Sequence, residues 1–463
     1  MKRGLIIILL FSYVNVYAQT IKLISKTTKG SELTLSTYGE GVLSIDWGTG
    51  TPINTESGIA KGIFGGDTIR ITLSEGITSL DCSNCRIKWI DVNDANQLIT
   101  LDCSNNDIEN IDISCLETLE ELNCSNNALT KLDISNNSRL RYLDCSDNNI
   151  EALNLNNNKN LETLICSNNK LSELNTYNNP YLCSLWANDN TINNLNLTTN
   201  GNLNSVIVSN NDINDLLFNN IRGIEDLWAE NNKLNSLDLS NSSSFITINI
   251  SNNQLDSLNL EGYNGSQIIW LFDCANNHLA MSSFLPNTLV KNYKGGLQES
   301  VYCGFDTLEL NKYYQMKKMF SNITGTKIAS VTAWDAKTKE QLTKGSSSTN
   351  DYSCTQDKIN FHKTFSSVYL EFTSSKISDL LIRTKPFTVI DKSLEGVYSA
   401  SVPKHLYVKS NDNGLILWGD KQKIIIHNIK GVAVWNGNID NMPKTISLQK
   451  GFYIINGEIW EVK

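Results

Sequence analysis

The segment LITLDCSNNDI at residues 98–108 states a pattern that recurs along residues 77–285. The place of Leu101 in this pattern is taken in the other copies by Leu80, Leu122, Leu143, Leu164, Leu185, Val206, Leu227, Ile248 and Phe272. Every step from Leu80 to Ile248 is 21 residues, and the last step, to Phe272, is 24. Because chance does not keep a register through so many copies, this segment decides the fold of the region.

The recurring pattern L-x-x-L-x-C-x-x-N-x-L, at this period, is typical of a leucine-rich repeat solenoid. Within a strand, alternation places Leu101 and Cys103 on one face and Asp102 on the other. Stacked copies then form a parallel sheet whose inner side chains make a continuous core. We therefore predict a mainly β fold, with a leucine-rich repeat solenoid of about ten repeats and a concave parallel sheet.

Two more columns of the repeat hold polar or reactive atoms. Three residues after the Cys position stand Asn106, Asn127, Asn148, Asn169, Asn190, Asn211, Asn232, Asn253 and Asn277. Stacked Asn side chains can satisfy backbone groups at the turns. The Cys position holds Cys82, Cys103, Cys124, Cys145, Cys166 and Cys274, and elsewhere Ala187, Val208, Ala229 and Ile250. Such a position asks for a small apolar group, so we expect buried free thiols rather than a metal ladder.

The segments around the repeats indicate export and capping. Residues 1–18 combine a basic start, an apolar run and a small residue, Ala18, as a secretory signal peptide does. The apolar run is too short to span a membrane comfortably, so we expect cleavage near Ala18 and no transmembrane helix. Residues 19–76 alternate short apolar strands with Gly-rich turns, which predicts an N-terminal β cap over the solenoid end.

After residue 285 the repeat pattern gives way to other β sequence. Residues 296–390 alternate polar and apolar positions between turn clusters, which predicts an Ig-like β-sandwich. Residues 391–463 predict a C-terminal β module. The cysteines outside the repeat column are Cys85, Cys115, Cys183, Cys303 and Cys354. The last two share one module, so we expect them to form a disulfide in an exported protein, while the pairing of the first three stays open.

The repeat unit has two parts, and its second half is exemplified by LDISNN at residues 132–137. This two-part unit resembles the short bacterial leucine-rich repeats called IRREKO repeats, which are frequent in surface proteins of Bacteroidetes. The resemblance covers residues 77–285. It implies an extracellular interaction scaffold, and it names no ligand.

The chain's end, with ISLQKGFYII at residues 446–455 and a late Lys463, resembles the C-terminal sorting domain of type IX secretion substrates. Those domains end in a comparable L-x-x-G-x-Y strand and carry an earlier N-x-x-G-x-x-V, here NIKGVAV at 428–434. The resemblance implies display at the outer-membrane exterior or release. A plain structural β module is the alternative.

Several function classes are disfavoured by the sequence. A net charge of −9 with scattered Lys and Arg argues against a nucleic-acid partner. The sequence holds no G-x-S-x-G elbow, no H-E-x-x-H and no Gly-rich phosphate loop. None of its four histidines stands beside a nucleophile or a second ligand. We therefore expect no enzyme activity, no catalytic residue, no metal site and no cofactor.

One column of the repeat suggests a binding site. The residue between the Leu and Cys positions points out of the concave sheet and reads Asp81, Asp102, Asn123, Asp144, Ile165, Trp186, Ile207, Trp228, Asn249 and Asp273. Its four apolar members, Ile165, Trp186, Ile207 and Trp228, are consecutive and should form an exposed stripe. Tyr142 and Glu230 stand in flanking columns and could supply polar edges. An apolar patch with a polar rim is the usual mark of a contact surface.

These features predict a non-enzymatic extracellular scaffold, secreted or on the cell surface. Its ligand would be a protein or a glycan of a host or microbial surface, and the scaffold itself would be a monomer. The alternative is a structural spacer of the cell envelope without a ligand of its own.

Overall fold

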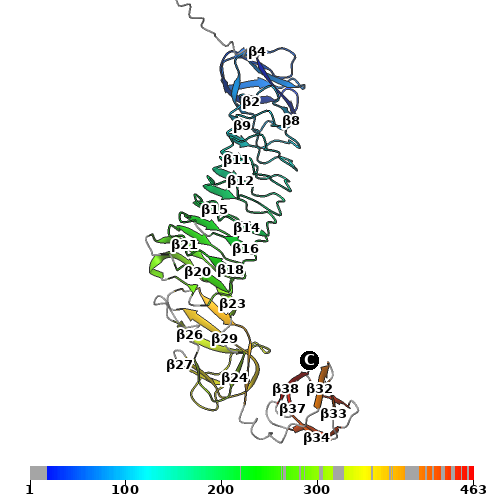
Figure 1. Cartoon of the computed structure of the whole chain (residues 1–463), viewed down its shortest axis with the longest axis vertical. Coiled ribbons are helices and arrows are strands. Elements are labelled where there is room, and N and C mark those ends of the chain that lie inside the picture. Colours follow the sequence, from blue (N-terminus) through cyan, green and yellow to red (C-terminus); the bar gives the residue numbers. More distant parts are fainter. Residues whose placement is uncertain are drawn as a thin grey trace, which may run out of the picture. The chain divides into compact units, whose positions relative to one another are not determined.

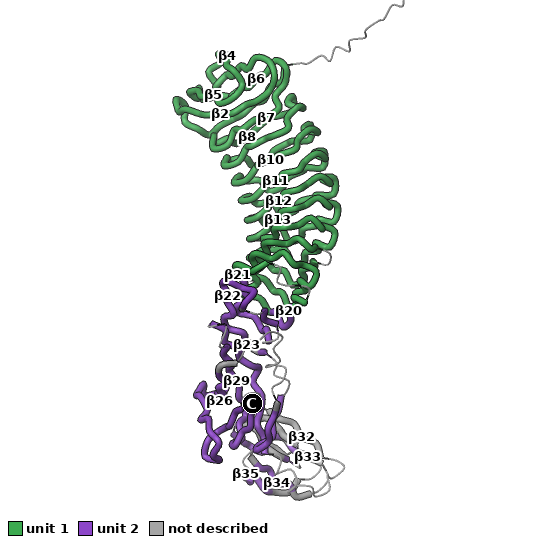
Figure 2. The backbone as a smooth tube through the Cα atoms, turned by 90° about the vertical axis from the view of Figure 1, so that its left-hand side faces the viewer, with its two compact units in different colours: residues 1–254, 259–271 green, residues 255–258, 272–463 purple. Residues whose placement is uncertain are grey.

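The structure is a computed structural model. It describes residues 18–218, 221–261, 263, 267–280, 283–285, 287–301, 306–315, 328–355, 358–374, 377, 379–391, 406–411, 414–419, 422–428, 433–439, 444–449, 451–455 and 458–462. The expected signal peptide, apart from Ala18, lies outside these residues. The chain divides into two compact units, one of residues 1–254 and 259–271 and one of residues 255–258 and 272–463 (Figure 2).

The first unit begins with two antiparallel groups of strands. They are β1 (Gln19–Ser25), β2 (Glu32–Gly39), β3 (Leu43–Asp46), β4 (Ile53–Thr55), β5 (Gly58–Ile63), β6 (Ile69–Leu73), β7 (Ile77–Asp81) and β8 (Ile87–Asp91). One group forms a sheet in the order β4-β3-β6-β1-β8. In the other, β2 pairs with β5 on one side and with β7, the first repeat strand, on the other. The N-terminal strands therefore continue the repeat sheet by main-chain hydrogen bonds.

The repeats form a row of short parallel strands, stacked one above the other (Figure 1). After β7 come β9 (Thr100–Asp102), β10 (Glu121–Asn123), β11 (Tyr142–Asp144), β12 (Thr163–Ile165), β13 (Ser184–Trp186), β15 (Ser205–Ile207), β17 (Asp226–Trp228) and β19 (Thr247–Asn249). Leu101 lies opposite Leu80 and Leu122, and this register holds along the row. These core side chains are all buried. The predicted solenoid and its parallel sheet are confirmed, and the outward side of this sheet is called the open face below.

The second half of each repeat forms a looser row. Its later strands are β14 (Asn194–Asn196), β16 (Asp215–Leu217), β18 (Ser236–Asp238) and β20 (Ser257–Asn259). A second column of buried Asn side chains, Asn137, Asn158, Asn179 and Asn200, lies here. The Nδ2 atom of Asn158, for example, donates to the carbonyl oxygens of Ile134 at 3.0 Å and Asn137 at 2.9 Å. The Asn residues in the second half of each repeat therefore link successive repeats by hydrogen bonds.

The Asn column beside the open-face strands closes the turns, as predicted. Asn106 Nδ2 donates to the carbonyl oxygens of Cys103 and Cys82, each at 3.0 Å, and its Oδ1 accepts from the N–H of Ile87 at 2.8 Å. The same arrangement recurs in later repeats, for instance at Asn253. The thiols of the Cys column, Cys82, Cys103, Cys124, Cys145, Cys166 and Cys274, are free and buried, which confirms their expected packing role.

The second unit begins with segments that follow the last repeats. They include β21 (Ile269–Asp273), which starts in the first unit, a 3-10 turn (Asn287–Leu289) and β22 (Val290–Lys294). Gln298 is fully buried and makes the hydrogen bonds that an Asn of the column makes in earlier repeats. Its Nε2 donates to the carbonyl oxygens of Cys274 and Gly295, and its Oε1 accepts from the N–H of Leu279 at 2.9 Å. The repeat hydrogen-bonding pattern thus extends 21 residues beyond Asn277.

Residues 296–390 form two small sheets. Their strands are β23 (Leu297–Val301), β24 (Thr307–Glu309), β25 (Tyr314–Gln315), β26 (Ile328–Asp335), β27 (Tyr352–Thr355), β28 (Lys358–Phe361), β29 (Phe365–Ser374), β30 (Leu381–Thr384) and β31 (Phe387–Ile390). One sheet runs β23-β30-β29-β31-β24 with β26 also on β29, and the other runs β25-β28-β27. The pairs β23–β30 and β24–β31 are parallel, whereas an immunoglobulin sandwich consists of antiparallel sheets. Alternation of polar and apolar residues predicts strands but does not specify their direction.

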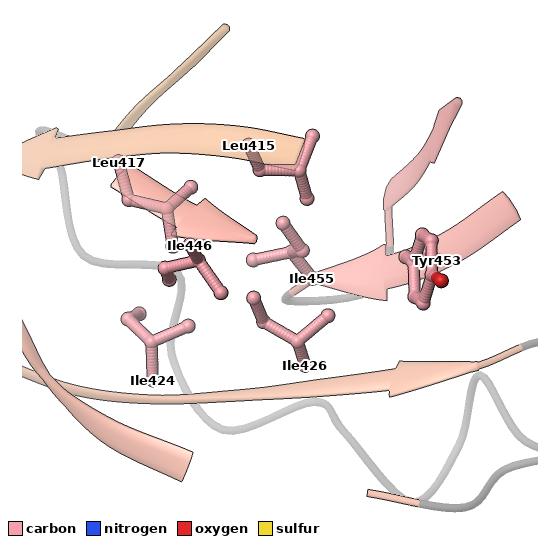
Figure 3. Close-up of a cluster of buried hydrophobic side chains, with 7 residues drawn as sticks. All are labelled: Leu415, Leu417, Ile424, Ile426, Ile446, Tyr453 and Ile455. Atoms are coloured by element: carbon pink, nitrogen blue, oxygen red, sulfur yellow. The ribbon is translucent and has the colours of Figure 1, made fainter. Parts of the chain in front are cut away.

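The last described strands are β32 (Leu406–Asn411), β33 (Gly414–Gly419), β34 (Gln422–Asn428), β35 (Ala433–Ile439), β36 (Lys444–Ser447), β37 (Gly451–Ile455) and β38 (Glu458–Val462). They make two antiparallel sheets, β32-β33-β36 and β35-β34-β37-β38. Figure 3 shows their shared core of Leu415, Leu417, Ile424, Ile426, Ile446, Tyr453 and Ile455. The L-x-x-G-x-Y segment thus places Tyr453 in this core, and its hydroxyl donates to the carbonyl oxygen of Gln449 at 2.6 Å.

Within the described part of the chain, no helix has both the length and the apolar character needed to cross a membrane.

Candidate binding face

The four apolar residues of the predicted stripe lie side by side on the open face. Ile165, Trp186, Ile207 and Trp228 end the neighbouring strands β12, β13, β15 and β17 and are register partners in that order. Since neighbouring strands are about 4.8 Å apart, the stripe is roughly 15 Å long. Trp186 is 41% exposed and the other three side chains are half-buried. The repeat register alone produces this alignment.

The two flanking residues named from the sequence lie apart from each other. Tyr142 begins β11 and is half-buried, and burial, followed by the charge of Asp144, raises the pKa of its hydroxyl. Glu230 follows β17, and its Oε2 accepts a hydrogen bond from the Ser209 hydroxyl at 2.7 Å. Glu230 is therefore held by the neighbouring repeat, on the Cys-column side of the stripe.

A hollow of about 670 Å³ opens on the first part of the stripe. Its lining consists of Asp144, Ser146, Asp147, Ile165, Ser167, Asn168, Trp186, Asn188, Asp189 and Ile207. Trp228, Tyr142 and Glu230 lie outside this lining. The hollow therefore joins three apolar stripe residues to a rim of short polar side chains, of which three are carboxylates.

The rim is built by a backbone conformation that the sequence analysis did not single out. The residue before each ladder Asn, and in the first repeat the residue before Cys85, is left-handed, with positive φ, at Asn84, Asn105, Asn126, Asp147, Asn168, Asp189, Asn210, Asn231, Asn252 and Asn276. Among residues with a side chain, Asn and Asp adopt this conformation most readily. The signal was present in the sequence as the first Asn or Asp of each turn pair.

Hydrogen bonds between repeats fix the rim side chains. The Nδ2 atom of Asn168 donates to Asp147 Oδ1, and that of Asn210 donates to Asp189 Oδ1 at 2.8 Å. Asn188 Nδ2 donates to the other oxygen of Asp189 at 2.6 Å. The carboxylates are therefore held in place beside Trp186 before any ligand arrives, which lowers the entropy cost of binding.

The described residues contain no group of three or more His, Cys, Asp or Glu side chains arranged to hold a metal ion. The hollow offers apolar surface, hydrogen-bond acceptors and negative charge. These are the means of non-covalent recognition.

Cys303 lies outside the described residues, so its disulfide with Cys354 stays a prediction.

Comparisons with known proteins give likeness at the level of solved structures. No protein-family profile and no curated protein matches the chain. The leucine-rich repeat domain of APL1B is 18% identical, covers 50% of this chain and 81% of its own, and has a TM-score of 0.40. A functional domain of InlJ from Listeria monocytogenes, which includes a cysteine ladder, is 18% identical over 71% of this chain and 94% of its own, with a TM-score of 0.23.

The fold is a leucine-rich repeat solenoid. The strand register and the Asn column of the chain itself show this fold. Another of them, an internalin C2 from Listeria monocytogenes, is 23% identical over 30% of this chain and 73% of its own, with a TM-score of 0.25. A fold alone does not indicate a ligand, so the open-face residues must be interpreted from this chain alone.

Proposed function

We propose that this protein is a non-enzymatic binding scaffold that holds a protein partner on the open face of its repeats. The observation that carries the proposal is the stripe of Ile165, Trp186, Ile207 and Trp228. The rest of the same column is polar, from Asp81 to Asp144 before the stripe and at Asn249 and Asp273 after it. Trp at the centre of an apolar patch with a polar rim is the usual anchor of a protein contact.

A structural spacer accounts less well for this stripe. The polar members of the column support their own turns, since Asn123 Oδ1 accepts from the Ser125 N–H at 3.2 Å and Asp144 Oδ1 accepts from the Ser146 N–H at 3.0 Å. Trp and Ile cannot make these bonds, so Trp186 gives up a local hydrogen bond and adds exposed apolar surface. A spacer does not benefit from exposed apolar surface that replaces a local hydrogen bond, whereas a binding face needs such surface.

The test is a selection of displayed peptides on the immobilised full chain, followed by affinity measurements on variants. Trp186→Ala with Trp228→Ala should weaken the selected peptides by about tenfold or more, because Trp anchors commonly carry such energies. The matched control is Trp89→Ala, which removes a 42% exposed Trp of β8, away from the stripe. Unfolding curves should show both variants folded.

Three results would contradict the proposal. One is that the selected peptides bind the double variant as tightly as the unaltered chain. The other is that no peptide is selected while a glycan array gives Trp186-dependent binding, which would replace the protein partner by a sugar. Equal losses in the double variant and in Trp89→Ala would likewise count against the stripe.

We further propose that the scaffold works outside the cell, after signal-peptide removal near Ala18 and recognition of residues 391–463 by a type IX secretion apparatus. The support is the sequence resemblance of that region together with its folded β core around Tyr453. A chain lacking residues 391–463 should stay in the periplasm of a host that has this apparatus. Normal surface display of the truncated chain would refute the sorting role.

A further inference from the structure

The left-handed column of the open face carries negative charge at one place only. Eight of its ten members are Asn, and the exceptions, Asp147 and Asp189, are the two that line the hollow on either side of Asn168. With Asp144 they bring three carboxylates to the hollow that contains Trp186. The two exceptions are two strands apart, or roughly 10 Å.

The fold does not require these charges. Asp147 and Asp189 each accept one hydrogen bond from the Asn one repeat later, and Asp189 also accepts one from Asn188, a bond that needs an acceptor oxygen but no charge. In other repeats an Asn does the same work, since Asn126 donates to Asn105 Oδ1 and Asn231 donates to Asn210 Oδ1, both at 2.7 Å. Asn also tolerates the left-handed backbone at least as well as Asp. The extra charge therefore has to be explained by something other than the turn.

The charges are also not neutralised within the chain. Among the described residues, none of Asp144, Asp147 and Asp189 has a Lys, Arg or His within ion-pair distance. The ion pair of Arg141 with Glu162 lines a different hollow. Three carboxylates without an ion-pair partner around one hollow raise the local negative potential, and a cationic ligand would relieve it.

We propose that this hollow receives a Lys or Arg side chain from an extended segment of the partner polypeptide. The proposal rests on the proposed function and names its ligand chemistry. The aliphatic stem of such a side chain would pack on Ile165 and Ile207, and the Trp186 indole would face its cation. The charged end would lie between Asp147 and Asp189. There it would make charge-assisted hydrogen bonds, which are stronger than hydrogen bonds between neutral groups.

A neutral sugar fits the same hollow less well. Sugar hydroxyls can donate to carboxylates, and they can also donate to the Asn oxygens that the rest of the column supplies. A cation gains most from Asp in place of Asn at positions 147 and 189, because it adds charge attraction to the hydrogen bond. The charge pattern therefore favours a basic polypeptide over a neutral glycan.

The test uses two synthetic peptides and the full chain. In the first peptide Lys alternates with Thr, which favours an extended backbone, and in the second every Lys is ε-acetylated and therefore neutral. The unaltered chain should bind the Lys peptide at least about tenfold more tightly than the acetylated one. In Asp147→Asn with Asp189→Asn this preference should fall below about threefold.

The matched control is Asp112→Asn with Asp133→Asn, which removes the same two charges from the other row of the solenoid. Both residues hold a turn N–H at 3.0 Å, and Asn154 does the same in the next repeat, so the control should fold and keep the full preference. An equal loss of preference in the control would refute the site and leave only net charge as the cause. So would an unaltered chain that binds neither peptide.

The outcomes separate this inference from the proposed function. If both peptides bind alike and Trp186→Ala weakens both, the stripe binds polypeptide and the cationic inference is wrong. If the Asp variants abolish the preference while Trp186→Ala changes nothing, the acidic hollow binds cations and the stripe is not the docking surface.

Discussion

Asn148 reaches one repeat back to the preceding strand, where its Nδ2 donates to the carbonyl oxygen of Cys124 at 3.0 Å. The same amide donates to Cys145 and Ser146, and Asn148 Oδ1 accepts from the Leu129 N–H at 2.9 Å. One side chain thus satisfies backbone groups of two repeats, in a place where its own exposure is only 8%. The open face depends on such side chains to hold its strands in register.

Asn148→Ala should therefore lower the free energy of unfolding by about 3 kcal/mol, because it leaves buried carbonyl and N–H groups without partners. Chemical denaturation followed by circular dichroism measures this loss. The control is Asn149→Ala, since the Asn149 side chain makes no hydrogen bond among the described residues, and it should cost well under 1 kcal/mol. Equal effects of the two changes would mean that the Asn column is not a structural ladder.

The register of the solenoid was predictable because its period is constant. Once Leu101, Leu122 and Leu143 are aligned, alternation decides which side chains enter the core and which reach the open face. Trp186 could be placed beside Ile165 and Ile207 for this reason. The cap was predicted only as β structure. Its residues do not repeat, so no register in the sequence indicates that β2 pairs with β7.

The acidic rim was not predicted, although its residues were visible. Its position depends on the left-handed backbone of Asp147 and Asp189. The sequence pattern shows that Asn recurs at this position, but it does not show the backbone angle φ. The role of Gln298 was not predicted for another reason. It replaces Asn by a longer side chain and follows an irregular segment, so a search for Asn at a fixed step ended at Asn277.

The Cys column should be chemically inert in the native protein. Burial raises the pKa of the Cys103 and Cys166 thiols to about 12, which leaves almost no thiolate at neutral pH. Cys115 and Cys183, both half-buried, should be alkylated before the column thiols, as mass spectrometry of iodoacetamide-treated protein would show. Fast native labelling of Cys103 would contradict the packing role. Cys103→Ala should cost only about 1 kcal/mol, because Ala187 and Ala229 fill the same position in later repeats.

The cap contains an ion pair whose contribution should depend on pH. Lys22 Nζ lies 3.0 Å from Asp91 Oδ2, and the hydrogen bond from Lys22 lowers the pKa of the Asp91 carboxyl. A lowered folded-state pKa means that the stabilisation is present above the unfolded value of about 3.9 and is lost as the pH falls through the folded value.

Lys22→Gln should therefore cost roughly 0.5–1 kcal/mol at neutral pH and almost nothing in strong acid. A carboxyl titration by NMR should show the pKa of Asp91 rising in this variant. Lys61→Gln, which removes an exposed partner of Glu32 at 3.7 Å, is the control and should change stability little. A loss for Lys22→Gln that persists in strong acid would assign its role to packing instead of charge.

Fluorine NMR of protein labelled with 5-fluorotryptophan tests most directly whether a polypeptide partner binds the stripe on the open face. Single Trp→Phe changes would assign the resonances of the nine Trp residues. On addition of a peptide selected on the full chain, the resonances of Trp186 and Trp228 should shift, and those of Trp89 and the buried Trp47 should not. Shifts confined to Trp89, with Trp186 and Trp228 unchanged at saturation, would contradict the account.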